Sequence, residues 1–123
     1  MADPQNRPDR SVVLTKAFVR AGEALGLTQQ TLASVVGLSP ATVSRMAAGK
    51  YVLDPGSKHW ELAALLVRLY RGLDAIMAGD ETAVRAWLFN PNTDLRAVPA
   101  TLITRISGLN TVVSYVDASR ARL

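Results

Sequence analysis

The sequence predicts an all-α protein, with an N-terminal helix-turn-helix bundle followed by a small helical domain. Apolar residues recur three and four positions apart through most of the chain, and no segment alternates apolar and polar residues as a half-buried strand does. Glycine, proline and capping residues divide these periodic segments into separate helices. The composition, 49% hydrophobic and 20% charged, is that of a globular protein.

The first ten residues are polar, contain two prolines and lack the apolar core of a signal peptide. No stretch approaches the 18 uncharged apolar residues of a membrane span. We therefore expect a cytoplasmic protein that contacts no membrane. Its expected parts are a flexible tail (1–10), a helix-turn-helix domain (11–60), a connecting buried helix (61–79) and a second small domain (80–123).

The residue inventory argues against an enzyme. The chain has no Cys, a single His and no glycine-rich phosphate loop, and its acidic residues are scattered. His59 alone makes neither a catalytic triad nor a metal site, so we expect no cofactor and no metal. The net charge is +4, and residues 1–50 supply most of it, with six Lys or Arg against three Asp or Glu. This excess mildly favours an anionic partner.

The front half divides into three helices. The first is expected over Val12–Leu25, where apolar residues such as Leu14, Phe18 and Leu25 form one stripe, and Gly26 ends it. Thr28 is a suitable N-cap for a second helix over Gln29–Val36. Ser39 and Pro40 are a strong start signal for a third helix, which runs to about Ala48.

The strongest functional signal lies within residues 29–48. A helix-turn-helix needs a small residue where its helices cross, a glycine at the turn and a branched apolar residue where the second helix meets the first. Ala33, Gly37 and Val43 fill these three roles. Gly37 permits a positive φ that costs other residues about 1 kcal/mol or more. The segment therefore predicts a double-stranded DNA partner.

In such a motif the second helix enters the major groove and presents its N-terminal side chains to base edges. Arg45 is the best candidate base reader, because arginine can bridge O6 and N7 of guanine; the alternatives are a phosphate clamp or a solvated surface arginine. Lys50 is either a phosphate contact or a solvated lysine. The predicted DNA-binding residues are Thr28, Gln29, Ser39, Ala41, Thr42, Ser44, Arg45 and Lys50.

The back half begins with the longest helix, Ser57–Ala78, whose apolar residues cover so much of its circumference that we expect it between two layers. Asp80 starts the next helix, which runs through Leu88. A short helix is expected from Pro99 to about Ile106, and Gly108 is expected to separate it from a last helix over Leu109–Arg120. Trp60 and Trp87 are expected in the core, although Trp87 could alternatively anchor a partner.

The front half resembles the Xre/Cro-like type of helix-turn-helix. The residues that carry this resemblance are Leu27-Thr28-Gln29, Leu32-Ala33, Val36-Gly37-Leu38-Ser39, Thr42-Val43-Ser44-Arg45 and Ala48-Gly49. The back half resembles the toxin-binding domain of the Xre/MbcA/ParS antitoxins. Here the resemblance rests on Trp87-Leu88, the Asn90-Pro91-Asn92 turn, Pro99, Gly108 and Tyr115-Val116-Asp117. It departs at Arg96-Ala97, where many members have paired glycines, and is therefore closer to the MbcA-like branch.

The resemblance implies a function. Such antitoxins bind a RES-domain toxin, an enzyme that degrades NAD, and they repress their own operon. It also implies a toxin-binding surface near the chain's end, for which the predicted residues are Arg105, Tyr115, Arg120, Arg122 and Leu123. Phe89, beside the Asn90-Pro91 turn, is predicted either to contact the toxin or to pack in the core. The segment 119–123 is either a frayed end or a plug for the toxin's cleft.

Two other functions stay open. The chain could be a free-standing repressor whose back half only forms a homodimer, in which case no toxin gene would lie beside it. It could also be an interaction module with a vestigial DNA motif, since Arg45 alone among the base-facing side chains is long. A salt titration separates this last possibility, because DNA binding weakens steeply with salt. A homo-oligomer is expected because one helix-turn-helix offers a small recognition surface.

Overall fold

The structure is a computed structural model that describes residues 9–122. These residues form seven helices, and no strand runs among them apart from a single bridge between Asn92 and Ala97. The all-α prediction is confirmed. The helices are α1 (Arg10–Ala24), α2 (Gln29–Val36), α3 (Pro40–Ala47), α4 (Lys58–Ile76), α5 (Glu81–Phe89), α6 (Pro99–Leu102) and α7 (Ile106–Ala121).

Helix α1 begins before the residue that the sequence pattern predicts. The Asp9 carboxylate accepts a hydrogen bond from the Ser11 N–H at 2.7 Å and so caps the first turn. Helical structure therefore starts at Arg10, inside the tail expected over residues 1–10; the part of that expectation covering residues 1–8 lies outside the described residues. The other domain boundaries stay predictions.

The expectation that Gly108 separates two helices is wrong. Helix α6 ends at Leu102, and Gly108 lies inside α7. A Cβ placed on Gly108 would stand 2.1 Å from the backbone oxygen of Leu102. Glycine is present because α7 passes directly against the end of α6, and a local sequence rule reads such a residue as a helix break.

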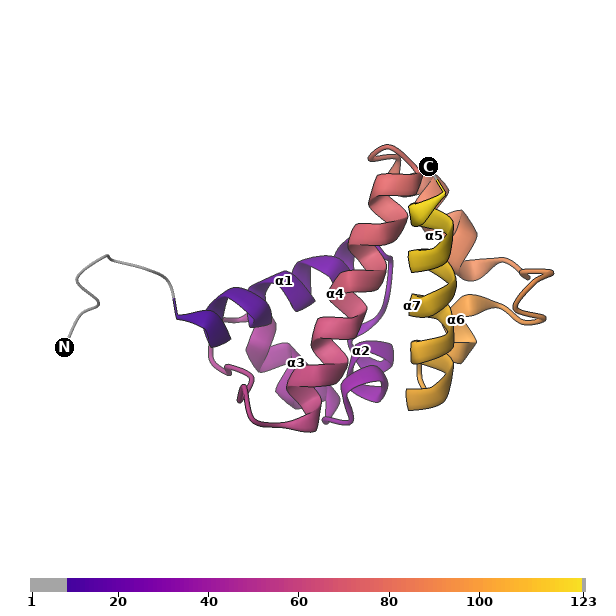
Figure 1. Cartoon of the computed structure of the whole chain (residues 1–123). Coiled ribbons are helices and arrows are strands. Elements are labelled where there is room, and N and C mark those ends of the chain that lie inside the picture. The colour runs from indigo at the N-terminus through magenta and orange to yellow at the C-terminus, as the bar shows by residue number, and fades with distance from the viewer. Residues whose placement is uncertain (1–8, 123) are drawn as a thin grey trace.

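Helix α4 lies at the centre of the molecule (Figure 1). It packs against α1 and α2 of the front half and against α5 and α7 of the back half. Its buried residues accordingly span a wide part of its circumference, as the apolar pattern predicts. They are Trp60, Ala63, Leu66, Val67, Leu69, Gly72 and Leu73.

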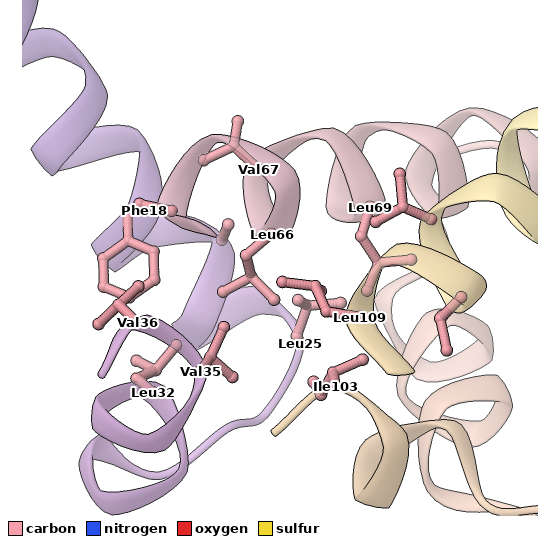
Figure 2. Packing of buried hydrophobic residues seen from close by; sticks show 14 of the residues in the cluster. Phe18, Leu25, Leu32, Val35, Val36, Leu66, Val67, Leu69, Ile103 and Leu109 are labelled. Carbon is pink, nitrogen blue, oxygen red and sulfur yellow. The ribbon is translucent and has the colours of Figure 1, made fainter. Parts of the chain in front are cut away.

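One hydrophobic cluster joins the two halves. Figure 2 shows Leu25 and Leu66 in the same buried cluster as Ile103 and Leu109 of the back half, and all four side chains are fully buried. Helix α7 contributes its buried residues Leu109, Val112, Val113 and Val116 to this cluster. The front half and the back half are therefore held together by a shared core.

Candidate functional site

The helix-turn-helix has the local structure that its sequence predicts. The hydroxyl of Thr28 accepts the Thr31 N–H at 3.1 Å, and the hydroxyl of Ser39 accepts the Thr42 N–H at 3.1 Å, so each of the two helices has a side-chain cap. Gly37 adopts the left-handed conformation, with φ 72°, between them. Ala33 and Val43 are buried where α2 and α3 meet. The side chains at the start of α3 are thereby fixed in direction.

Seven of the eight residues predicted to bind DNA are exposed: Thr28, Gln29, Ser39, Ala41, Ser44, Arg45 and Lys50. All seven belong to α2, α3 or the residues that flank these helices. The structure thus brings them onto the motif's own surface. Their role as DNA contacts remains a prediction.

Thr42 does not point outward, contrary to the sequence expectation. Its side chain is buried, and its hydroxyl lies 2.9 Å from the Ser39 hydroxyl and accepts a hydrogen bond from the Arg45 guanidinium at 3.2 Å. Thr42 is buried because it is part of the cap of α3. In this structure its hydroxyl orients Arg45, the predicted base reader.

Two contacts that the sequence did not predict hold the motif in place. His59 Nδ1 lies 2.6 Å from the backbone oxygen of Val36, which ties the start of α4 to the end of α2. The buried Thr15 hydroxyl donates to the Ser11 backbone oxygen at 2.7 Å and accepts the Leu53 N–H at 3.0 Å. These bonds satisfy backbone groups in a helix end and a loop, so His59 and Thr15 have structural roles.

A second candidate surface surrounds the loop between α5 and α6. Trp87 is partly buried rather than a full core residue, and its ring stacks on that of Tyr115 with centroids 6.3 Å apart. The Tyr115 hydroxyl donates a 2.5 Å hydrogen bond to the Asp94 carboxylate. This bond is the main cause that raises the pKa of Tyr115 above its ordinary value. Phe89, at the end of α5, is 47% exposed.

The loop between α5 and α6 accommodates Arg96-Ala97, where the sequence departs from the paired glycines of many family members. Arg96 adopts a left-handed conformation with φ 57°, at one of the two positions where the resemblance predicts glycine. The loop is closed by the Asn92 N–H, which donates to the Ala97 oxygen at 2.9 Å, and by the Leu95 N–H, which donates to the Asn92 side chain at 3.0 Å. These bonds offset the cost of holding a non-glycine residue in that conformation.

The residues predicted to bind a toxin do not form one cluster. Arg105 precedes α7, whereas Arg120 and Arg122 lie at its other end, about 22 Å away at the 1.5 Å rise of an α-helix. All three are exposed, and Tyr115 lies between them along the helix. Leu123 lies outside the described residues. The predicted set therefore lies at both ends and on more than one side of α7: Tyr115 packs toward Trp87 of α5, whereas Arg120 lies against α1 and α4.

A side-chain contact between the two halves, which we call the Arg85 clamp, was not predicted from the sequence. The Arg85 guanidinium, on α5, donates to the backbone oxygens of Ala24 and Glu23, both at 3.0 Å. These are carbonyls at the C-terminal end of α1, where a cation is favourable. The partners are 61 and 62 positions apart, and no local pattern signals such a contact.

Within residues 9–122, no group of three or more His, Cys, Asp or Glu side chains is arranged to hold a metal ion. Over the same range, no helix is both long enough and apolar enough to cross a membrane.

Comparisons with known proteins match both halves of the chain. Residues 4–68 match the family model of the antitoxin Xre-like helix-turn-helix domain, which is more than half of the chain. Residues 73–122 match the model of the antitoxin Xre/MbcA/ParS C-terminal toxin-binding domain. The chain belongs to the Xre/MbcA/ParS family of antitoxins. In this antitoxin, α1 to α3 and most of α4 form the helix-turn-helix domain, and α5 to α7 belong to the toxin-binding domain.

The antitoxin is also similar to a chain in the crystal structure of the M. tuberculosis MbcT–MbcA toxin–antitoxin complex. The two share 26% identity with a TM-score of 0.66, and the match covers 90% of this chain and 96% of that chain. A search of curated proteins found no match.

Proposed function

We propose that this antitoxin binds and inhibits a RES-type, NAD-degrading toxin and represses its own operon through its helix-turn-helix. The observation that carries the proposal is the likeness of nearly the whole chain to a chain of a toxin–antitoxin complex, at 26% identity. A free-standing repressor would account for the likeness of the helix-turn-helix domain but not for that of the toxin-binding domain. In our proposal both partners, the operator DNA and the NAD-degrading enzyme, lie in the cytoplasm, and the antitoxin acts there.

The DNA-binding step uses the start of α3. Ser39, Ala41, Ser44 and Arg45 are exposed there, and the Thr42 hydroxyl holds the Arg45 guanidinium at 3.2 Å. In our proposal Arg45 contacts a guanine edge, while Lys50 and the N-terminal end of α2 contact phosphates. Because a single module presents few base-reading side chains, we propose a homodimer that reads two half-sites.

The toxin-binding step uses the end of α5 and exposed residues of α7. Phe89 provides an exposed aromatic anchor, and the Tyr115–Asp94 hydrogen bond fixes the loop beside it. Arg120 and Arg122 bring positive charge to the C-terminal end of α7. We propose that this end enters the toxin's cleft and blocks its substrate, with Arg105 contacting the toxin at the opposite end of the helix.

Co-expression with the product of the adjacent gene tests the toxin-binding step. We expect restored growth and a stable complex on purification, and a chain truncated before Ser119 should bind the toxin but restore growth poorly. If the neighbouring product is harmless or does not bind, the toxin-binding proposal fails and an ordinary repressor remains.

Promoter binding by the purified antitoxin tests the DNA-binding step. Arg45→Ala should relax discrimination among operator sequences, whereas Lys50→Ala should weaken binding to all sequences equally and reduce the salt slope by about 0.9. A binding curve that does not change between low and high salt would contradict a DNA contact.

A further inference from the structure

A basic groove, which shares only Arg120 with the predicted sites, runs between α1, α4 and the end of α7. One stripe of α1 (Arg10, Val13, Leu14 and Ala17) faces one stripe of α4, and Arg120 closes the groove from α7. The cavity measures about 580 Å³, which is large enough for several side chains of a partner. Its α4 wall consists of Trp60, Ala64, Val67, Arg68 and Arg71. Helices α1 and α4 cross here, as Figure 1 shows.

The groove combines an apolar floor with a positively charged rim. Val13 is 50% exposed, and Trp60 lies under the Arg10 guanidinium at 5.2 Å from the ring centroid. Among residues 9–122, no carboxylate lines the cavity, whereas four arginines do. Of these, Arg68 pairs with Asp117 at 2.7 Å.

A second hollow of about 440 Å³ continues the groove along α1. It shares Val13, Ala17 and Arg71 with the first hollow and adds Lys16 and Arg20, and again no carboxylate of the described residues lines it. The positions from Arg10 to Arg20 span about 15 Å of helix, the length of nearly three helical turns. The combined surface therefore suits an elongated segment better than a small molecule.

The arginines around the groove indicate which kind of partner can bind in it. A second copy that packed the same face symmetrically would bring the arginine rims together, and such like-charge contacts are costly. A DNA backbone would satisfy the rim but leave the apolar floor without a partner. A protein segment that carries both carboxylates and apolar side chains satisfies the rim and the floor together.

We propose that the toxin places an acidic, amphipathic segment in this basic groove, so that it contacts α1 and α4 as well as α7. This inference rests on the proposed toxin partner. The groove ends at Arg120, which also belongs to the C-terminal end of α7 that we propose enters the toxin. In this proposal the toxin contacts the helix-turn-helix half directly.

Affinity measurements with the purified toxin test the proposal. In the full-length antitoxin, Arg71→Glu and Val13→Glu alter the rim and the floor. Two matched controls alter exposed residues outside the groove: Lys58→Glu reverses a charge, and Val52→Glu changes a valine that is 45% exposed. Circular dichroism and thermal melting show whether each variant is folded.

We expect each groove variant to bind the toxin about ten-fold more weakly, whereas both controls bind as the wild type does. The wild-type affinity should also fall more steeply with salt than that of Arg71→Glu. Groove variants that bind the toxin normally would overturn this inference and leave the proposed function intact. A Val13→Glu substitution that halves the mass of the free antitoxin would also overturn this inference and leave the proposed function intact, because a second copy of the chain would then occupy the groove. A wild-type chain that binds no toxin would overturn the proposed function, and this inference with it.

Discussion

The contact between Gly72 and Val116 sets how closely α4 and α7 approach, and it allows a quantitative prediction. A Cβ on Gly72 would stand 2.6 Å from Val116 Cγ1, well inside the distance of an ordinary contact, and both residues are buried. Gly72→Ala therefore forces the two helices apart or the valine from its rotamer. Overpacking of this kind costs about 1–3 kcal/mol, and the helix propensity of alanine returns about 1 kcal/mol.

The paired substitution sharpens this prediction. Val116→Ala alone removes two buried methyl groups and should cost about 2 kcal/mol. In the double variant the methyl group introduced at position 72 meets only the Cβ at position 116, 3.9 Å away, which is an ordinary van der Waals distance. The double variant therefore loses the clash at Val116 but keeps the gain in helix propensity from alanine at position 72. The double variant should therefore be more stable than Val116→Ala by about 1 kcal/mol.

Urea denaturation of the four proteins measures this coupling as a double-mutant cycle. The reasoning predicts a favourable interaction energy of about 2 kcal/mol between the two substitutions. A Gly72→Ala variant that is more stable than the wild type, or energies that simply add, would refute the claim that this contact limits the approach of α4 and α7.

Three further predictions concern hydrogen bonds that the structure shows. Arg85→Ala should lower the free energy of unfolding by about 1 kcal/mol, because it removes two charge-assisted bonds to the end of α1; unchanged urea denaturation would contradict the clamp. Thr15→Val should cost about 1–3 kcal/mol by leaving the Leu53 N–H without its acceptor, whereas Thr15→Ser keeps the hydroxyl and should cost less; equal losses in the two variants would count against this bond. Because the Asp94 carboxylate raises the pKa of Tyr115, the neutral phenol is favoured in the folded state, and the associated stability is present below pH 10 and lost as pH rises through the folded pKa. Asp94→Asn should lower the titration midpoint of one tyrosine in an absorbance titration, and identical titrations would show that this carboxylate has no such effect.

The sequence predicts helix positions here mainly because their caps are local. Thr28 and Ser39 each cap a backbone N–H three residues further on. Gly37 is a residue type that adopts a positive φ without strain, so its place at the turn can be predicted from its identity. The wide apolar surface of the long helix likewise predicts its central place, since such a helix needs partners on two sides.

The sequence fails where a residue's role depends on a distant neighbour. Gly108 is predicted as a break, yet it lies inside α7 because the Leu102 backbone leaves no space for a Cβ. Thr42 is predicted to face DNA, yet the Ser39 cap draws its hydroxyl inward. The Arg85 clamp joins residues 61 and 62 positions apart. The basic groove is assembled from three helices, so its arginines have no common pattern in the sequence.

The most direct test of the central claim is the rate at which the purified toxin consumes NAD as this antitoxin is titrated against it. Our account predicts that the rate falls to the background level once the antitoxin saturates the toxin, and that a chain truncated before Ser119 inhibits poorly. An unchanged rate in the presence of excess antitoxin would contradict the account.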